Sequence, residues 1–123
     1  MDDHGFLLSL YITPANRNDR YGAERCLGGK RHHLPRLQKI WADAGYVIQA
    51  LNDWCAIQGW QLETDHRKDT GFAVLPKRWI VERTFAWLYK YRRLCFDFER
   101  TVQSSEYLIQ AAMSRLMLRR LAA

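Results

Sequence analysis

The sequence lacks any apolar run near the roughly 20 residues that a membrane-spanning helix needs. Its acidic first residues are not typical of a signal peptide. It has only three cysteines, Cys26, Cys55 and Cys95, and their spacing fits neither a disulfide framework nor a zinc site. There is no internal repeat and no long linker, so the 123 residues form one domain at most. We therefore expect a cytoplasmic protein with reduced thiols and no membrane segment.

Positive charge is present but unevenly spread. Residues 1–70 hold nine basic and nine acidic residues, whereas residues 71–123 hold ten basic and four acidic ones, which accounts for the net charge of +6. Cations gathered in one part of a chain indicate a polyanionic partner. The alternative is a solvated basic surface. Aromatic residues among these cations favour nucleic acid: Trp79, Phe85, Trp87, Tyr89 and Tyr91.

The order of apolar patterns predicts an α/β fold. Residues 6–13 form an apolar run that is rich in strand formers and closed by Pro14, which predicts a buried strand. Residues 16–22 are polar and predict a loop. Further strands are expected over 37–42 and 60–64, and helices over 23–27, 47–58, 76–93 and from Ser104 or Ser105 to Leu121. Gly59 is placed to end the second of these helices.

The helix over 76–93 is the part most informative about function. Pro76 suits its first turn, and helical spacing predicts one broad buried face: Ile80, Val81, Thr84, Phe85, Trp87, Leu88 and Tyr91. Glu82 falls outside that face, one turn after Arg78. One interpretation is an exposed ion pair between these two residues. The other is a metal-binding acid whose basic neighbours hold a phosphate backbone.

Two aspartates are candidate partners for Glu82. Asp43 ends a predicted strand just before a helix, where ligands gather in α/β folds, although an acid there is also a common turn former. Asp2 precedes the turn at His4 and Gly5. Three converging carboxylates require a cation, and hard oxygen ligands suit Mg²⁺ or Mn²⁺.

Two such ions would support phosphodiester cleavage and strand transfer. The tryptophan and tyrosine rings are then expected to stack on unpaired bases at a strand end. Basic residues would hold the phosphates: Arg78, Arg83, Lys90, Arg92 and Arg93.

Residues 40–46, 71–88, 92–94 and 114–121 closely resemble bacterial insertion-sequence transposases of the DDE class. The most similar group is insertion-sequence family five, within the family-four-like set. The resemblance implies a ribonuclease H-like core with an acidic triad for a divalent metal. It assigns the catalytic and metal-binding acids as Asp2 (in preference to Asp3), Asp43 and Glu82. It matches Arg78 to the arginine of the signature around the glutamate, but places Tyr89, beside Lys90, where the family has a lysine.

The N-terminus of this chain differs from the pattern of the family that it resembles. In such cores a central strand precedes the first aspartate, whereas this chain begins one residue before Asp2. We therefore expect residues 1–123 to be a single partial DDE catalytic domain, truncated at its N-terminus and followed by C-terminal helices. As the C-terminal part of a transposase, it is expected to be inactive alone.

The partners implied by the resemblance are transposon-end and target DNA, and an upstream-frame product or a full-length transposase. The expected location is the bacterial cytoplasm, in association with the nucleoid. The alternative function is a non-catalytic basic module that binds DNA or a transposase.

Overall fold

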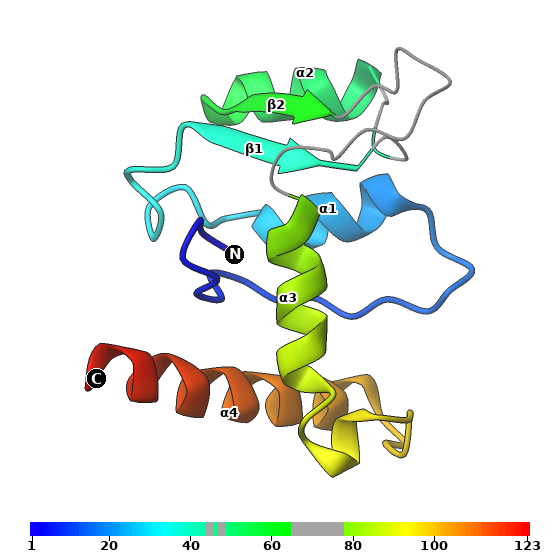
Figure 1. Cartoon of the computed structure of the whole chain (residues 1–123). Coiled ribbons are helices and arrows are strands. Elements are labelled where there is room, and N and C mark those ends of the chain that lie inside the picture. Colours follow the sequence, from blue (N-terminus) through cyan, green and yellow to red (C-terminus); the bar gives the residue numbers. More distant parts are fainter. Residues whose placement is uncertain (44–45, 47–48, 65–77) are drawn as a thin grey trace, which may run out of the picture. The chain divides into compact units, whose positions relative to one another are not determined.

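The computed structural model describes every residue except 44–45, 47–48 and 65–77 (Figure 1). The chain divides into two compact units, which we describe one by one. The central unit is Pro14–Pro76, and the terminal unit combines Met1–Thr13 with Lys77–Ala123. Helices and a small sheet are both present, so the prediction of a mixed α/β chain is confirmed in this coarse form. None of the helices in the described part of the chain has the length and apolar composition that a bilayer requires.

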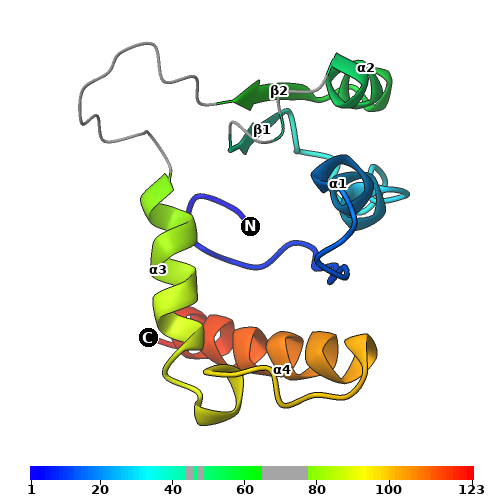
Figure 2. The same cartoon turned by 90° about the vertical axis from the view of Figure 1, so that its right-hand side faces the viewer.

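The central unit contains a two-stranded parallel sheet. Strand β1 (Lys39–Ala42) pairs with β2 (Gln61–Thr64), and Lys39 lies opposite Gln61. Helix α2 (Gln49–Gln58) connects the strands and lies beside the sheet (Figures 1 and 2), because a parallel pair needs a crossover connection. Both predicted strands are confirmed, with narrower bounds.

The core of the central unit is built on α2. Leu51 and Cys55, one helical turn apart, are almost fully buried against Trp60. Gly59 ends the helix as predicted. Its φ of +85° belongs to the left-handed region, and the Trp60 N–H reaches back to the Cys55 carbonyl, as in a Schellman motif.

Helix α1 (Asp19–Leu27) is longer than the sequence predicts. The polar stretch before it is not all loop, because the Asn18 side chain accepts a hydrogen bond from the Tyr21 N–H and caps the helix. Asp19 then places a negative charge in the first turn, where the helix dipole favours it. The pair Asn18 and Asp19 is therefore the signal in the sequence for the start of α1.

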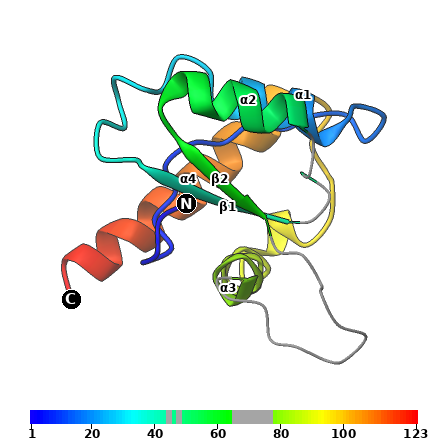
Figure 3. The same ribbon diagram turned by 90° about the horizontal axis from the view of Figure 1, so that it is seen from above.

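The terminal unit is built from α3 (Arg78–Leu88), a short 3₁₀ helix (Arg92–Leu94) and α4 (Val102–Leu121). Figures 1 and 3 show α3 crossing α4 steeply. The prediction that α3 reaches Arg93 is wrong. After Tyr89 the N–H groups of Lys90 and Tyr91 bond three residues back, and this tightening ends the α-helix. The predicted start at Pro76 lies outside the described residues.

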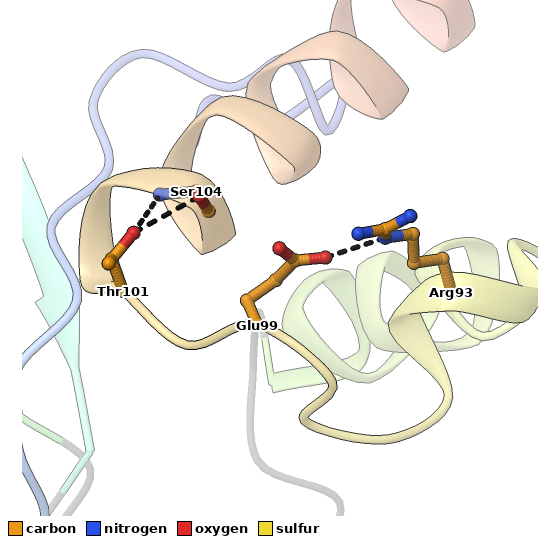
Figure 4. A network of polar contacts seen from close by, with 4 residues as sticks. All are labelled: Arg93, Glu99, Thr101 and Ser104. Atoms are coloured by element: carbon orange, nitrogen blue, oxygen red, sulfur yellow. Dashed lines mark hydrogen bonds and ion pairs between the residues drawn. The ribbon is translucent and has the colours of Figure 1, made fainter.

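Helix α4 begins at Val102, one turn earlier than the prediction. The hydroxyl of Thr101 accepts from the Ser104 N–H at 3.2 Å, so Thr101 is the cap and neither Ser104 nor Ser105 has that position (Figure 4). Ala112 and Met113 are buried in the middle of the helix.

Residues 6–13 form no strand, and that prediction is wrong. The His4 carbonyl accepts a hydrogen bond from Arg120, and the Ile12 N–H donates to Glu106, so the segment runs along α4 in the opposite direction. The segment is not part of a strand ladder, because it has no neighbouring strand among the described residues.

Gly5 allows the N-terminal turn to approach α3 closely. Its φ is +80°, and a Cβ there would lie 3.0 Å from the Trp87 ring and 2.8 Å from Nη2 of Arg83. Gly29 also has a positive φ, +68°, but a Cβ there would meet nothing within 4 Å. A comparison of alanine substitutions at the two glycines therefore distinguishes the cost of backbone strain from the cost of a steric clash.

We predict that Gly5→Ala lowers the free energy of unfolding by about 2–4 kcal/mol, from backbone strain and displacement of a rigid indole. Gly29→Ala is the control and should cost only the strain of about 1–2 kcal/mol. Urea denaturation followed by tryptophan fluorescence measures both. Equal losses for the two variants would contradict a close approach at Gly5.

Candidate functional site

Helix α3 holds Glu82 at the protein surface. Ile80 and Thr84 are buried on one side of the helix, and the Thr84 hydroxyl donates to the Ile80 carbonyl. The opposite side is open to solvent: Val81 and Phe85, predicted to be buried, are 45% and 57% exposed. The buried face is thus narrower than the sequence pattern predicts, and it leaves Glu82 accessible.

Among the described residues, Glu82 has one ion pair, and it is weak. Nε of Arg78 lies 3.3 Å from its carboxylate, and the Glu82 side chain is 67% exposed. Exposed pairs one turn apart contribute only about 0.3–0.5 kcal/mol, and an acid that follows its basic partner is in the less favourable order. The exposed ion pair expected from the simpler interpretation is therefore present, but its small free energy leaves the carboxylate available to a stronger ligand.

Asp2 organises the N-terminal turn. Its Oδ1 atom accepts hydrogen bonds from the N–H groups of His4 (2.9 Å) and Phe6 (2.8 Å). The turn rests on α3, where the Thr84 hydroxyl contacts the Met1 sulfur at 3.0 Å. Asp2 thus belongs to the same unit as Glu82. Its observed contacts are those of a turn former.

Asp43 directly follows the carboxyl end of β1, as the sequence predicts. Its carbonyl accepts a hydrogen bond from the Tyr46 N–H at 2.9 Å. Burial raises the pKa of Tyr46 above 10.0, and the negative charges of Asp19 and then Asp43 raise it further. The Asp43 carboxylate therefore acts electrostatically on a phenol that packs against the core of the central unit.

The three predicted acids are divided between the units. Asp2 and Glu82 lie in the terminal unit and Asp43 in the central unit, so their convergence stays a prediction. Within the described part of each unit, no three histidine, cysteine or acidic side chains gather at one point. The donors themselves suit a hard cation, because all three are carboxylates and Glu82 is exposed.

Arg83 lies between two indole rings. Its guanidinium carbon is 4.6 Å from the Trp79 ring centroid and 4.5 Å from that of Trp87. Nε and Nη2 are buried and have no hydrogen-bond partner in the described structure, so the two cation–π contacts are what offset the desolvation of the charge. This geometry favours a structural role for Arg83 over the phosphate contact that the sequence suggested.

This stack was missed in the sequence. Trp79, Arg83 and Trp87 are spaced four residues apart, which places them on one stripe of a helix. Arg120 extends the stack, 5.1 Å from the Trp87 centroid and 5.4 Å from that of Phe6. With two guanidinium groups at Trp87, little of this ring is left for the base stacking that we expected of it.

The other predicted phosphate ligands differ in their availability. Arg93 is bound to Glu99 at 2.6 Å (Figure 4), and this hydrogen bond raises the pKa of Arg93. Lys90 and Arg92 are exposed, and neither has an ion pair with any described acid. Lys90 and Arg92 are thus the cations that can meet a phosphate without giving up another partner.

Tyr46 provides a test of the Asp43 environment. We predict that Asp43→Asn lowers the pKa of Tyr46, and that Asp19→Asn lowers it more, because Asp19 has the larger effect. Since the folded protein raises this pKa, Tyr46 stabilises the fold below about pH 10, and that contribution is lost as the pH rises through the folded pKa. Ultraviolet absorbance of tyrosinate, assigned with Tyr46→Phe, measures the shift. Asp53→Asn is the control, and an effect as large as that of Asp43→Asn would remove the specific role of Asp43.

This chain is similar to known proteins over most of its length. The sequence matches the family described as "Transposase DDE domain" over residues 1–117. It is 34% identical over 107 residues to a protein of Burkholderia cepacia described as a transposase for insertion sequence element IS402, a match that covers 80% of this chain and 51% of the relative. The chain thus spans about half the length of the curated relative it matches. No solved structure matches. The extent of the family match shows that this chain belongs to the DDE transposases.

Proposed function

We propose that this chain contributes the acidic and phosphate-binding residues of a transposase that cleaves DNA and transfers strands at insertion-sequence ends, with a divalent metal. The observation that carries the proposal is the exposed Glu82 carboxylate, whose one ion pair among the described residues is a weak contact with Arg78, in a chain that matches the DDE family almost throughout. Family membership supports a ribonuclease H-like core. Placement within insertion-sequence family five rests on the motifs at 40–46 and 71–88.

The proposed ligands of Mg²⁺ or Mn²⁺ are Asp2, Asp43 and Glu82. When bound, two such ions activate a water or a 3′-hydroxyl and stabilise the leaving oxygen. The chain itself would hold the DNA. Arg78 orients Glu82, and Lys90, Arg92 and Arg93 bind phosphates on the basic side of the terminal unit. We place this activity in the bacterial cytoplasm, at the nucleoid.

We further propose that these 123 residues do not cleave DNA by themselves. The described sheet has two strands, and the relative is about twice as long. A full-length transposase or an upstream-frame product would then be the partner that completes the site. The second candidate is a non-catalytic module that binds transposon ends or a transposase. The hydrogen bonds of Asp2 within its own turn favour this second candidate, because they give the acid a structural purpose.

Convergence of the acids can be tested without catalysis. We predict that Mn²⁺ broadens the NMR amide signals next to Asp43 and Glu82 at the same low concentration, because both carboxylates share the ion. Glu82→Gln should weaken the effect at both places. The variant should keep its free energy of unfolding within about 0.5 kcal/mol, since the side chain is exposed.

Asp97→Asn, which removes an exposed acid of the terminal unit, is the control and should leave the broadening unchanged. Broadening at only one of the two acids would refute a shared ion and favour the second candidate, the non-catalytic binding module. In a complex with full-length transposase, Mg²⁺-dependent cleavage of end-containing DNA that is unaffected by Glu82→Gln in this chain would exclude a catalytic role for Glu82.

Arg92 and Arg93 give a second test. Log K for DNA falls linearly with log salt, and each phosphate contact contributes about one unit to the slope. We predict that Arg92→Gln reduces the slope by about one, and that Arg93→Gln reduces it less, because Arg93 must first leave Glu99. Glu99→Gln should strengthen binding through Arg93. Fluorescence anisotropy over a salt series measures all three. Equal losses at Arg92 and Arg93 would show that the Glu99 pair does not compete with DNA.

A further inference from the structure

A basic cavity of about 470 Å³ lies in the terminal unit, where the end of α3 meets the C-terminal half of α4. Its size falls within the range of ligand pockets. Four of the lining residues are cations and none is an acid. The residues that line the basic cavity are Trp87, Lys90, Tyr91, Arg115, Leu116, Arg119 and Arg120.

The structure describes no acid that neutralises the cations of the basic cavity. Lys90, Arg115 and Arg119 form no ion pair with any acid that the structure describes, whereas Arg78 and Arg93 each have one. Like charges around one cavity repel each other. An anion in the cavity would relieve this repulsion, so the arrangement favours a negatively charged ligand.

Helix electrostatics explain only half of this cluster. Arg119 and Arg120 lie in the last turn of α4, where the helix dipole favours cations. Arg115 lies before that turn, and Lys90 comes from the other side of the cavity, after the end of α3. The helix dipole therefore does not explain why Lys90 and Arg115 line the same cavity.

One guanidinium of the basic cavity is held in place. Arg120 donates to the His4 carbonyl and lies over the rings of Phe6 and Trp87. Arg83 also lies over the Trp87 ring. The Tyr91 hydroxyl donates to the Ala112 carbonyl at 3.3 Å. The aromatic side chains of the cavity are thus used to fix the arginines and α4. This leaves charge, and not base stacking, as the means of recognition.

We propose that the basic cavity binds the sugar-phosphate backbone of duplex DNA without reading its sequence. The inference rests on the proposed function and extends it, because it adds Arg115, Arg119 and Arg120 of α4 to the DNA contacts. Arginine forks fit phosphate oxygens, and backbone contacts position DNA without specifying its sequence. In this role α4 is a second binding element, separate from the helix that carries Glu82.

The test uses the whole chain and two labelled duplexes of unrelated sequence. In the variant Arg115→Gln/Arg119→Gln the salt slope should fall by about two, one for each lost phosphate contact. The dissociation constant at low salt should rise on the order of tenfold, by the same amount for both duplexes. Lys90→Gln should reduce the slope by about one. Arg120 is left unchanged because it also holds the N-terminal turn.

The control is Arg36→Gln/Arg100→Gln, which removes the same charge from exposed arginines outside the cavity and should leave the slope unchanged. If the wild-type chain binds DNA and the cavity variant keeps the wild-type slope, this inference is wrong and the proposed function survives. If the wild-type chain shows no salt-dependent DNA binding, both are wrong. A loss of affinity for polyglutamate or for RNA, but not for duplex DNA, would assign the cavity to another partner and overturn the inference.

Discussion

The terminal unit depends on the burial of one positive charge between aromatic rings. Two nitrogens of Arg83 are buried without a hydrogen-bond partner among the described residues, and Trp79 and Trp87 are the groups that offset this cost. The same Trp87 ring lies under Arg120, which binds the N-terminal turn. Helix α3, helix α4 and residues 1–6 are therefore joined at a single indole. The position of Asp2 relative to α3 follows from that junction.

Local partners also determine how readily each arginine can bind DNA. Arg83 is stacked between two indoles, and Arg93 must leave Glu99 before it can bind a phosphate. Arg92 and Arg115 have no such partner among the described residues, and both are exposed. A count of basic residues in the sequence treats all of them alike. Their environments separate structural arginines from those that can bind phosphate.

Much of the central unit follows from the sequence, because its signals are local. Gly59 ends α2 by its backbone conformation, alternation of residues placed β2, and helical spacing placed α2. The segment 6–13 shows the limit of such signals. Its composition specifies an extended chain, but whether a neighbouring strand exists depends on residues far away in the sequence.

The candidate site was predictable to a similar degree. Asp43 at the end of β1 and Glu82 on α3 lie on the expected elements, because strand and helix patterns fix those positions. Exposure was not predictable in the same way. Val81 and Phe85 fit an apolar face, yet they face solvent, since the width of a buried face is set by what packs on it. Convergence of the acids is a long-range property that local patterns do not contain.

The division into units has a consequence for the order of folding. The central unit is one continuous stretch of chain, whereas the terminal unit joins the two chain ends across it. Joining residues 1–13 to α3 and α4 before the stretch between them has folded costs about 4 kcal/mol in loop-closure entropy. Prior folding of β1, α2 and β2 shortens the unfolded part of that loop and lowers this cost. The middle of the polypeptide is thus expected to fold first, and the junction around Trp87 to form late.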